Sequence, residues 1–127
     1  MIDGGEAAYA LIDEIEAFAE AQKSALPKLA GPVFTASETL RETTEWLVEQ
    51  DTNDRFAGAV PYLKLFARVL GAYYHLKAAA AAGADSARGR LAQVYVNRLL
   101  PEHGSLADEV RQGAEGLYAL SDEDLAA

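Results

Sequence analysis

An all-α fold is predicted by the composition of this sequence, by the spacing of its apolar residues and by its few helix breakers. Alanine, the best helix former, fills 26 of the 127 positions, whereas proline, the worst, fills 4. Apolar residues recur at steps of three and four along most of the chain, as on one face of a helix. We therefore expect an antiparallel helical bundle of four main helices with a short fifth helix near the C-terminus, in one domain over residues 1–127.

The first helix is predicted from about Glu6 to Ala25. Its apolar residues share one face, as in an amphipathic helix that packs on a core. These residues are Ala8, Leu11, Ile12, Ile15, Phe18 and Ala19. Three helix breakers follow, Pro27, Gly31 and Pro32, and we expect them to end this helix and to form a short connection.

A second helix is expected from Thr35 to about Gln50, because Thr35 and Glu38 have the spacing of a capping box. Its inner face is predicted to hold Leu40, Thr43, Leu47 and Val48. An acidic stripe consists of Glu38, Glu42, Glu45 and Glu49. Trp46 lies at the edge of the inner face, where its indole either covers the flank of the core or meets another protein surface.

A third helix, predicted from Phe56 or Ala59 to Ala82, is apolar on most sides. Pro61 suits its first turn and Gly83 its C-terminal cap. One apolar face holds Val60, Leu63, Phe66, Ala67, Leu70 and Tyr74, and a second set widens it: Tyr62, Leu65, Val69, Ala72, Tyr73 and Leu76. Cationic side chains interrupt the apolar run, so we expect no membrane span and interpret the segment as the central helix of the bundle.

A fourth helix is expected from a cap at Asp85 or Ser86 to about Leu100. Its predicted inward residues are Leu91, Val94, Tyr95 and Leu99. Arg98 falls in the middle of this predicted face, so it must extend to water, pair with an acid or meet a neighbouring surface. After a turn at Glu102, His103 and Gly104, Ser105 is expected to cap a fifth helix. Its heptad-like apolar residues are Leu106, Val110, Gly113, Leu117 and Leu120.

The charges are unevenly distributed along the chain. The formal net charge of −9 disfavours nucleic acid as a partner, because phosphates would be repelled. Residues 55–100 nevertheless carry seven bases and one acid. Candidate contacts for an anion or an acidic surface are Lys64, Arg68, His75, Arg88 and Arg98, together with Arg90. The alternative, which we favour, is that these bases pair with the acidic faces of the first two helices inside the bundle.

The sequence contains no complete set of catalytic residues. Cysteine is absent, the two histidines lack the partners of a di-metal or zinc motif, and the serines lie at predicted helix starts. No glycine-rich phosphate loop is present. We therefore expect this chain to supply no catalytic residue, no metal ligand and no cofactor site. The absence of a secretory pattern at the N-terminus leads us to expect a cytoplasmic protein.

Several short motifs follow one another in a fixed order. They are the residues at 58–66 (GAVPYLKLF), 69–74 (VLGAYY), 87–88 (AR) leading to Tyr95, 98–102 (RLLPE) and 113–117 (GAEGL). In this order and spacing the chain resembles, over essentially its whole length, the C-terminal helical domain of a subfamily of acyl-CoA dehydrogenases. Asp3, Gly4 and Gly5 look like the junction at which the catalytic core of such enzymes ends.

The resemblance implies an accessory domain that follows a flavin-binding core. The parent enzyme would remove hydrogens from Cα and Cβ of an acyl-CoA, with a glutamate as the base and FAD as the hydride acceptor. Neither the core nor a position that matches the base lies in these 127 residues, so no catalytic residue is carried over and FAD is expected only in the parent enzyme. The implied partners are the catalytic core and further subunits of a homo-oligomer.

Four aromatic side chains on the third helix exceed what a small bundle encloses easily. We therefore predict apolar contacts to a partner through Tyr62, Phe66, Tyr73 and Tyr74, with Trp46 as a further candidate. A different reading remains open, in which the chain is a stand-alone acidic helical module that binds a protein partner through its aromatic central helix.

Overall fold

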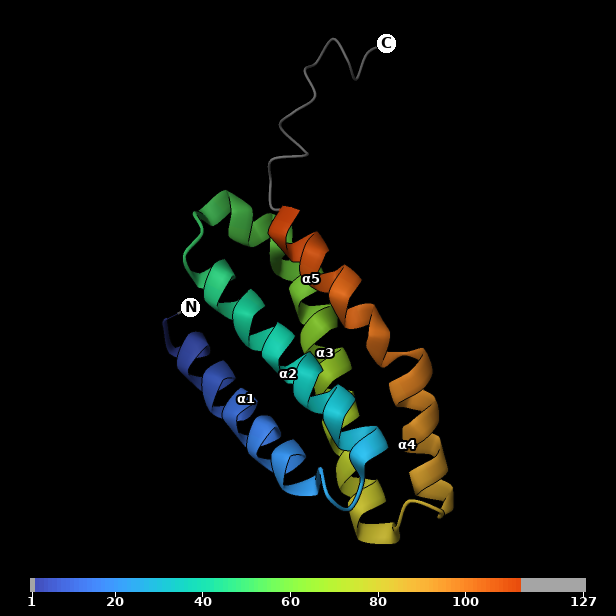
Figure 1. The fold of residues 1–127 in the computed structure, drawn as a ribbon. Helices are drawn as coiled ribbons and strands as arrows, with labels where there is room; N and C mark the ends of the chain where they lie inside the picture. Colours follow the sequence, from blue (N-terminus) through green and yellow to red (C-terminus); the bar gives the residue numbers. More distant parts are fainter. Residues whose placement is uncertain (1, 113–127) are drawn as a thin grey trace, which may run out of the picture.

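The computed structural model describes residues 2–112, which form α-helices, one short 3-10 helix and the turns between them. The elements are α1 (Ile2–Gln22), α2 (Pro27–Val48), α3 (Thr52–Ala82), α4 (Ala87–Arg98), η1 (Leu100–Glu102) and α5 (His103–Gln112). Helices α1, α2 and α3 alternate in direction, and α4, η1 and α5 together form a fourth, bent rod (Figure 1). The predicted all-α antiparallel bundle is confirmed.

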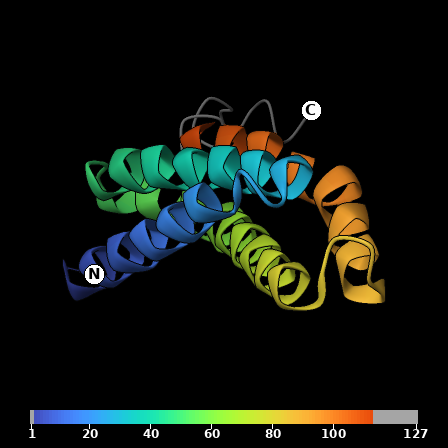
Figure 2. The ribbon, with the colours of Figure 1, turned by 60° about the horizontal axis from the view of Figure 1, so that its bottom comes forward.

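Helices α2 and α3 lie at the centre of the packing, since they contact each other and each also contacts α1, α4 and α5. In Figure 2, α2 and α5 form one layer, α3 lies under this layer, and α1 and α4 lie to either side. The largest fully buried apolar side chains come from every α-helix and from η1: Ile12, Ile15, Val33, Leu40, Leu65, Val69, Leu76, Leu100, Leu106 and Val110. Because each such side chain contributes about 1.5–3 kcal/mol on burial, this core is the main source of stability.

The connection between the first two helices was predicted to include Pro27, Gly31 and Pro32, and this prediction is wrong. Helix α2 begins at Pro27, and Gly31 and Pro32 lie inside it. Pro27 fits the first position of a helix because no N–H is needed there. Pro32 is exposed and lies close to the start of the helix, where water can replace the hydrogen bond that proline cannot donate.

The predicted capping box at Thr35 is wrong for the same reason, because this residue lies in the middle of α2. Nearby hydroxyls instead donate back to carbonyls of the preceding turn. Ser37 donates to the Phe34 carbonyl and Thr39 to the Thr35 carbonyl, at 2.6 and 3.2 Å. This is the usual behaviour of hydroxyl side chains inside a helix, where the backbone N–H groups are already bonded.

Helix α3 starts before the predicted position. Asp51 caps it and accepts a hydrogen bond from the Asp54 N–H at 3.0 Å. Pro61 therefore lies well inside the helix and not in its first turn. The first turns of α3 lie at an angle to its long remainder (Figure 1), and Pro61 explains this bend. The predicted end is confirmed, since Gly83 has a φ of 101° and its N–H bonds the Ala79 carbonyl.

The two apolar faces of α3 have opposite environments. The face that packs on the core consists of Leu65, Val69, Ala72, Tyr73, Leu76 and Ala79. Val60, Leu63 and Tyr74, which the sequence placed on one apolar face of the central helix, are 62%, 66% and 59% exposed. The prediction of a helix contacted on several sides is therefore wrong for this face.

Helix α4 also turns a different face inward than predicted. Ser86 caps it as expected, with its hydroxyl accepting from the Gly89 N–H at 3.0 Å. The buried residues are Gly89, Ala92 and Val96. The predicted inward residues Leu91, Val94 and Leu99 are exposed, and Tyr95 is half-buried. Gly89 makes room for the turn before α4, since a Cβ there would lie 2.3 Å from the Ala84 carbonyl oxygen. A pattern built on large apolar residues does not detect such small buried positions.

Helix α5 begins at His103, after a 3-10 turn that contains Pro101. The predicted turn at residues 102–104 and the cap at Ser105 are therefore wrong. Leu106 and Val110 are buried, as their spacing predicted. Gly113, Leu117 and Leu120, the other predicted positions of this helix, lie outside the described residues.

Candidate functional site

Arg68 is the one member of the predicted cationic set that pairs with an acid among the described residues. Its Nη2 donates to Glu102 Oε2 at 2.9 Å, and its backbone carbonyl accepts from the Tyr95 hydroxyl at 2.7 Å. The acid comes from η1, whereas the sequence argument expected an acid from the first two helices. These two bonds hold α3 to the segment that contains α4 and η1.

The other predicted cations lie on the surface. Lys64, Arg88 and Arg98 are exposed, and none of them forms an ion pair within residues 2–112. Arg98 lies on the outer side of α4, so the predicted conflict of an arginine on a buried face does not arise. Arg90 is also exposed and donates to the backbone carbonyl of Asp85 at 2.7 Å.

His75 lies on the side of α3 that faces α4. Its ring centroid is 4.6 Å from that of Tyr95. One turn earlier, Gly71 makes room for the same tyrosine, since a Cβ there would lie 2.4 Å from the Tyr95 hydroxyl oxygen. The edge of α3 that carries Lys64, Arg68 and His75 therefore faces α4.

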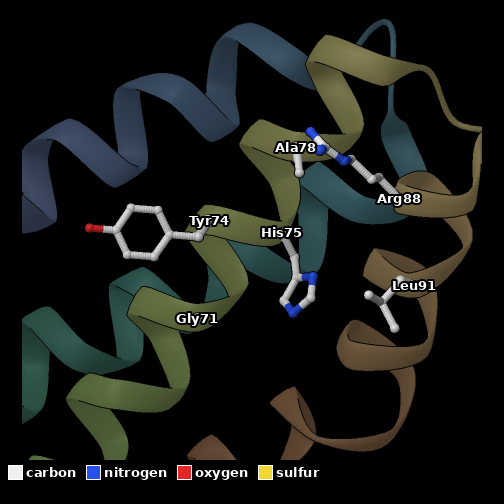
Figure 3. Close-up of a pocket in the computed structure, with 6 residues that line it drawn as sticks. All are labelled: Gly71, Tyr74, His75, Ala78, Arg88 and Leu91. Atoms are coloured by element: carbon white, nitrogen blue, oxygen red, sulfur yellow. The ribbon is translucent and has the colours of Figure 1, made fainter.

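An open hollow of about 370 Å³ lies between α3 and α4. Its lining consists of Gly71, Tyr74, His75, Ala78, Arg88 and Leu91. His75 and Leu91 point toward each other across the hollow, Arg88 extends toward Ala78, and the Tyr74 ring points away (Figure 3). The hollow thus has mainly apolar walls and a guanidinium at its rim.

The predicted aromatic contacts divide into three groups. Tyr74 is exposed. Trp46, Tyr62 and Phe66 are half-buried, and the last two pack against the core. Tyr73 is only 4% exposed, which leaves it outside any surface of this chain. The bundle encloses more aromatic area than the sequence argument allowed.

Tyr73 is held in place by α1. Its hydroxyl donates to Glu14 Oε2 at 2.7 Å, and its ring meets the Phe18 ring edge-on at 5.8 Å. Burial, together with the hydrogen bond and the negative charge of Glu14, raises the pKa of Tyr73 to about 12. This tyrosine is a structural link between α1 and α3.

The sequence reasoning predicted a contact surface on the third helix through aromatic residues, including Tyr74, but it did not recognise the aliphatic residues Val60, Leu63 and Leu91 as part of an exposed face. We define the outer face as Val60, Leu63, Ala67 and Tyr74 of α3 with Leu91 of α4. The α3 residues recur at helical spacing, so they lie on one side of the helix, opposite its core face. Leu91 lies beside them because it lines the hollow together with Gly71 and Ala78, which share this side of α3. The sequence did contain a signal for this exposed face: the third helix has two apolar faces, and packing on a core requires only one.

The lining of the hollow does not have the features of a metal or flavin site. No group of three His, Cys, Asp or Glu side chains in residues 2–112 could hold a metal ion. A flavin dinucleotide needs a walled pocket for its ring system and several donors for its diphosphate. The hollow is open and offers one guanidinium and one imidazole, so these residues do not fit FAD. Nor does any helix in this part of the chain have the length and hydropathy to cross a bilayer.

The sequence also matches a known protein family. The family model described as "acetyl-CoA dehydrogenase C-terminal like" matches residues 11–121. The matched range includes most of α1, all of α2 to α5 and both walls of the hollow. No protein with a curated description and no solved structure matches the sequence.

Proposed function

Because this chain belongs to the acetyl-CoA dehydrogenase C-terminal-like family, we propose that it is an accessory domain of a flavin-dependent acyl-CoA dehydrogenase. In this proposal a separate catalytic core binds FAD and removes hydrogens from Cα and Cβ of an acyl-CoA thioester. The helical domain supplies no catalytic group. It packs against that core and takes part in subunit contacts in a cytoplasmic homo-oligomer.

The observation that carries this proposal is the family match over residues 11–121. The outer face adds physical support, because Val60, Leu63, Tyr74 and Leu91 are each more than half exposed. Contiguous apolar surface of this kind is uncommon on a free soluble domain and is typical of contact sites. A domain that packs against a core requires such a surface, whereas a free-standing enzyme would require a closed pocket with polar groups.

The second candidate function is a stand-alone module that binds another protein. The same outer face favours it, because an exposed apolar face requires a partner but does not name one. The two proposals differ in whether a flavoprotein core is joined to this sequence, either in one polypeptide or in a tight complex.

The test is to isolate the native protein from its source cells with an antibody against this sequence. Its mass under denaturing conditions, its flavin absorbance and its acyl-CoA dehydrogenase activity with an artificial electron acceptor are then measured. We expect the sequence to be joined to a core that carries FAD and is active. A short polypeptide that binds no flavoprotein would contradict the proposal and favour the stand-alone module.

A further inference from the structure

The outer face of α3 is a straight stripe on the long part of the helix that follows the Pro61 bend. From Leu63 to Tyr74 the residues rise by about 17 Å, or roughly three helical turns. Val60 extends the stripe toward the bend. A narrow apolar stripe of this length matches the apolar face of a single helix laid along it.

The hollow at the end of the stripe provides an anchoring position. Gly71 and Ala78 form a shallow floor because they lack large side chains, while His75 and Leu91 form facing walls (Figure 3). One large apolar side chain of a partner fits a hollow of about 370 Å³ better than water does, since the walls are mainly apolar. Such pockets commonly hold the residue that contributes most to binding.

The charges beside the stripe indicate the chemistry of the partner. Lys64 lies exposed on the edge of α3 that faces α4, and Arg88 lies at the rim of the hollow. Neither has an ion-pair partner among the described residues. The neighbouring cation Arg68 is already occupied by Glu102. Carboxylates that flank an apolar helix would complement Lys64 and Arg88.

A second copy of this chain fits the face less well. A symmetric dimer through this face would bring the two sets of Lys64 and Arg88 toward each other, and like charges at a contact are costly. A contact between this face and the acidic stripe of α2 on another copy would be heterologous and would tend to continue into a chain of molecules.

We propose that the outer face docks an acidic amphipathic helix of the catalytic core, with one large apolar residue in the hollow and carboxylates opposite Lys64 and Arg88. The identity of the partner rests on the proposed function. The surface and the chemistry that it recognises rest on the exposure of the stripe, on the hollow and on the unpaired cations.

The first test measures protection of the face in the intact native protein. This chain contains no cysteine, so Leu63→Cys and Leu91→Cys place single reactive groups in it, and Glu42→Cys on the exposed side of α2 is the matched control. Maleimide labelling is followed at each site by peptide mass, before and after denaturation. We expect labelling at positions 63 and 91 to be at least about tenfold slower than at position 42 in the native protein, and equal after denaturation.

Labelling of all three sites at the same rate in the native protein would overturn the inference. If the protein then still carries an active flavoprotein core, the proposed function stands and only the docking surface is wrong. If the mass and the flavin absorbance show no core, the proposed function fails independently of the labelling result.

The second test identifies the chemistry of the partner with a carbodiimide. This reagent activates a carboxylate, the Lys64 Nζ attacks it, an amide forms and the reagent leaves as its urea. We expect a cross-linked peptide that joins Lys64 to an Asp or Glu of the core. Lys64→Arg should abolish it and preserve the positive charge. A cross-link from Lys64 to a carboxylate on another copy of this sequence, or none at all, would overturn the proposed acidic helix.

Discussion

The two apolar faces of α3 have similar residues and different surroundings. Leu65, Val69 and Leu76 on one face are fully buried by the rest of the bundle, whereas Val60 and Leu63 on the other remain exposed. The difference arises because α2 and α5 cover the first face and no helix in residues 2–112 covers the second. Apolar character therefore shows that a helix face needs a partner, and it does not show whether that partner belongs to the same chain.

Cations in two regions of the molecule also differ in whether they have an acidic partner. On α1 and α2, Arg41 bonds both Asp13 and Glu16, and this ion-pair cluster raises the pKa of Arg41. On α3 and α4, Lys64 and Arg88 have no acid within the described chain. Arg41 is therefore paired within the chain, whereas Lys64 and Arg88 have no ion-pair partner among the described residues.

The largest effect is expected from removing one leucine from each face of α3. Leu76→Ala should lower the free energy of unfolding by about 3 kcal/mol, because it leaves a cavity in the core. Leu63→Ala should change it by less than about 0.5 kcal/mol, since the side chain is mostly exposed. Denaturant unfolding followed by circular dichroism measures both. Equal losses would show that the outer face is covered within this chain.

High pH is expected to destabilise the bundle through Tyr73. Above pH 10 the unfolded chain releases the tyrosine proton, whereas the folded chain retains it until the pKa of about 12. The folded state then binds more protons, so stability falls as the pH rises through this range.

Tyr73→Phe removes this contribution and should make the decline between pH 10 and 12 shallower, although it loses about 1 kcal/mol at neutral pH with the hydrogen bond to Glu14. Part of the decline should remain, because burial also raises the pKa values of Tyr62 and Tyr95. Unfolding curves across this pH range provide the measurement. Parallel profiles for the two proteins would contradict the assignment to Tyr73.

An intermediate effect is expected at the boundary between the outer face and α4. Gly71→Ala should destabilise the fold by about 1–2 kcal/mol, because the new Cβ displaces Tyr95 from its bond to the Arg68 carbonyl. The cost should be smaller in a Tyr95→Phe background, where the hydroxyl oxygen is gone. Gly104→Ala is the matched control in the first turn of α5, since a Cβ there meets nothing within 4 Å apart from its chain neighbours and should add up to about 1 kcal/mol of stability. A double-mutant cycle measures the coupling between positions 71 and 95, and independent effects would contradict this packing.

The smallest effect is expected from the paired and unpaired cations. Arg41→Gln should cost up to about 1 kcal/mol at low salt and less at high salt, because it breaks a partly exposed ion-pair cluster. Arg88→Gln should leave fold stability within about 0.5 kcal/mol at either salt concentration. Thermal unfolding at two ionic strengths compares them. A larger loss for the Arg88 variant would indicate a partner for that side chain inside the bundle.

The sequence predicted helix ends and core positions correctly where they depend on local chemistry. Ser86 and Gly83 marked helix ends because a capping hydroxyl and a positive φ are local requirements. The acidic stripe of α2 and the buried positions Ile12, Ile15 and Leu40 followed from periodicity alone. Pro32 and Pro61 misled the prediction because a helix held by tertiary packing tolerates a proline that its local sequence would exclude.

The candidate site was less predictable because it depends on which faces meet. Periodicity placed Leu63 and Tyr74 with the core, and only the packing of α2 and α5 shows that they lie outside it. On α4 the large residues suggested an inward face, yet the buried face consists of Gly89, Ala92 and Val96. Arg68 was correctly singled out, but its partner Glu102 lies far along the sequence and could not be inferred from spacing.

The order of the helices has a consequence for how fast this domain folds. Helix α1 packs chiefly on α2, and α3 packs strongly on α4, so many contacts join neighbours along the chain through short turns. Topologies rich in such local contacts have a low entropic cost of loop closure and fold within microseconds to milliseconds. The outer face is therefore expected to be complete before slower assembly steps bring a partner to it. Until a partner binds, the exposed leucines of this face can drive self-association. The yield of soluble domain is therefore expected to fall as the time between folding and assembly increases.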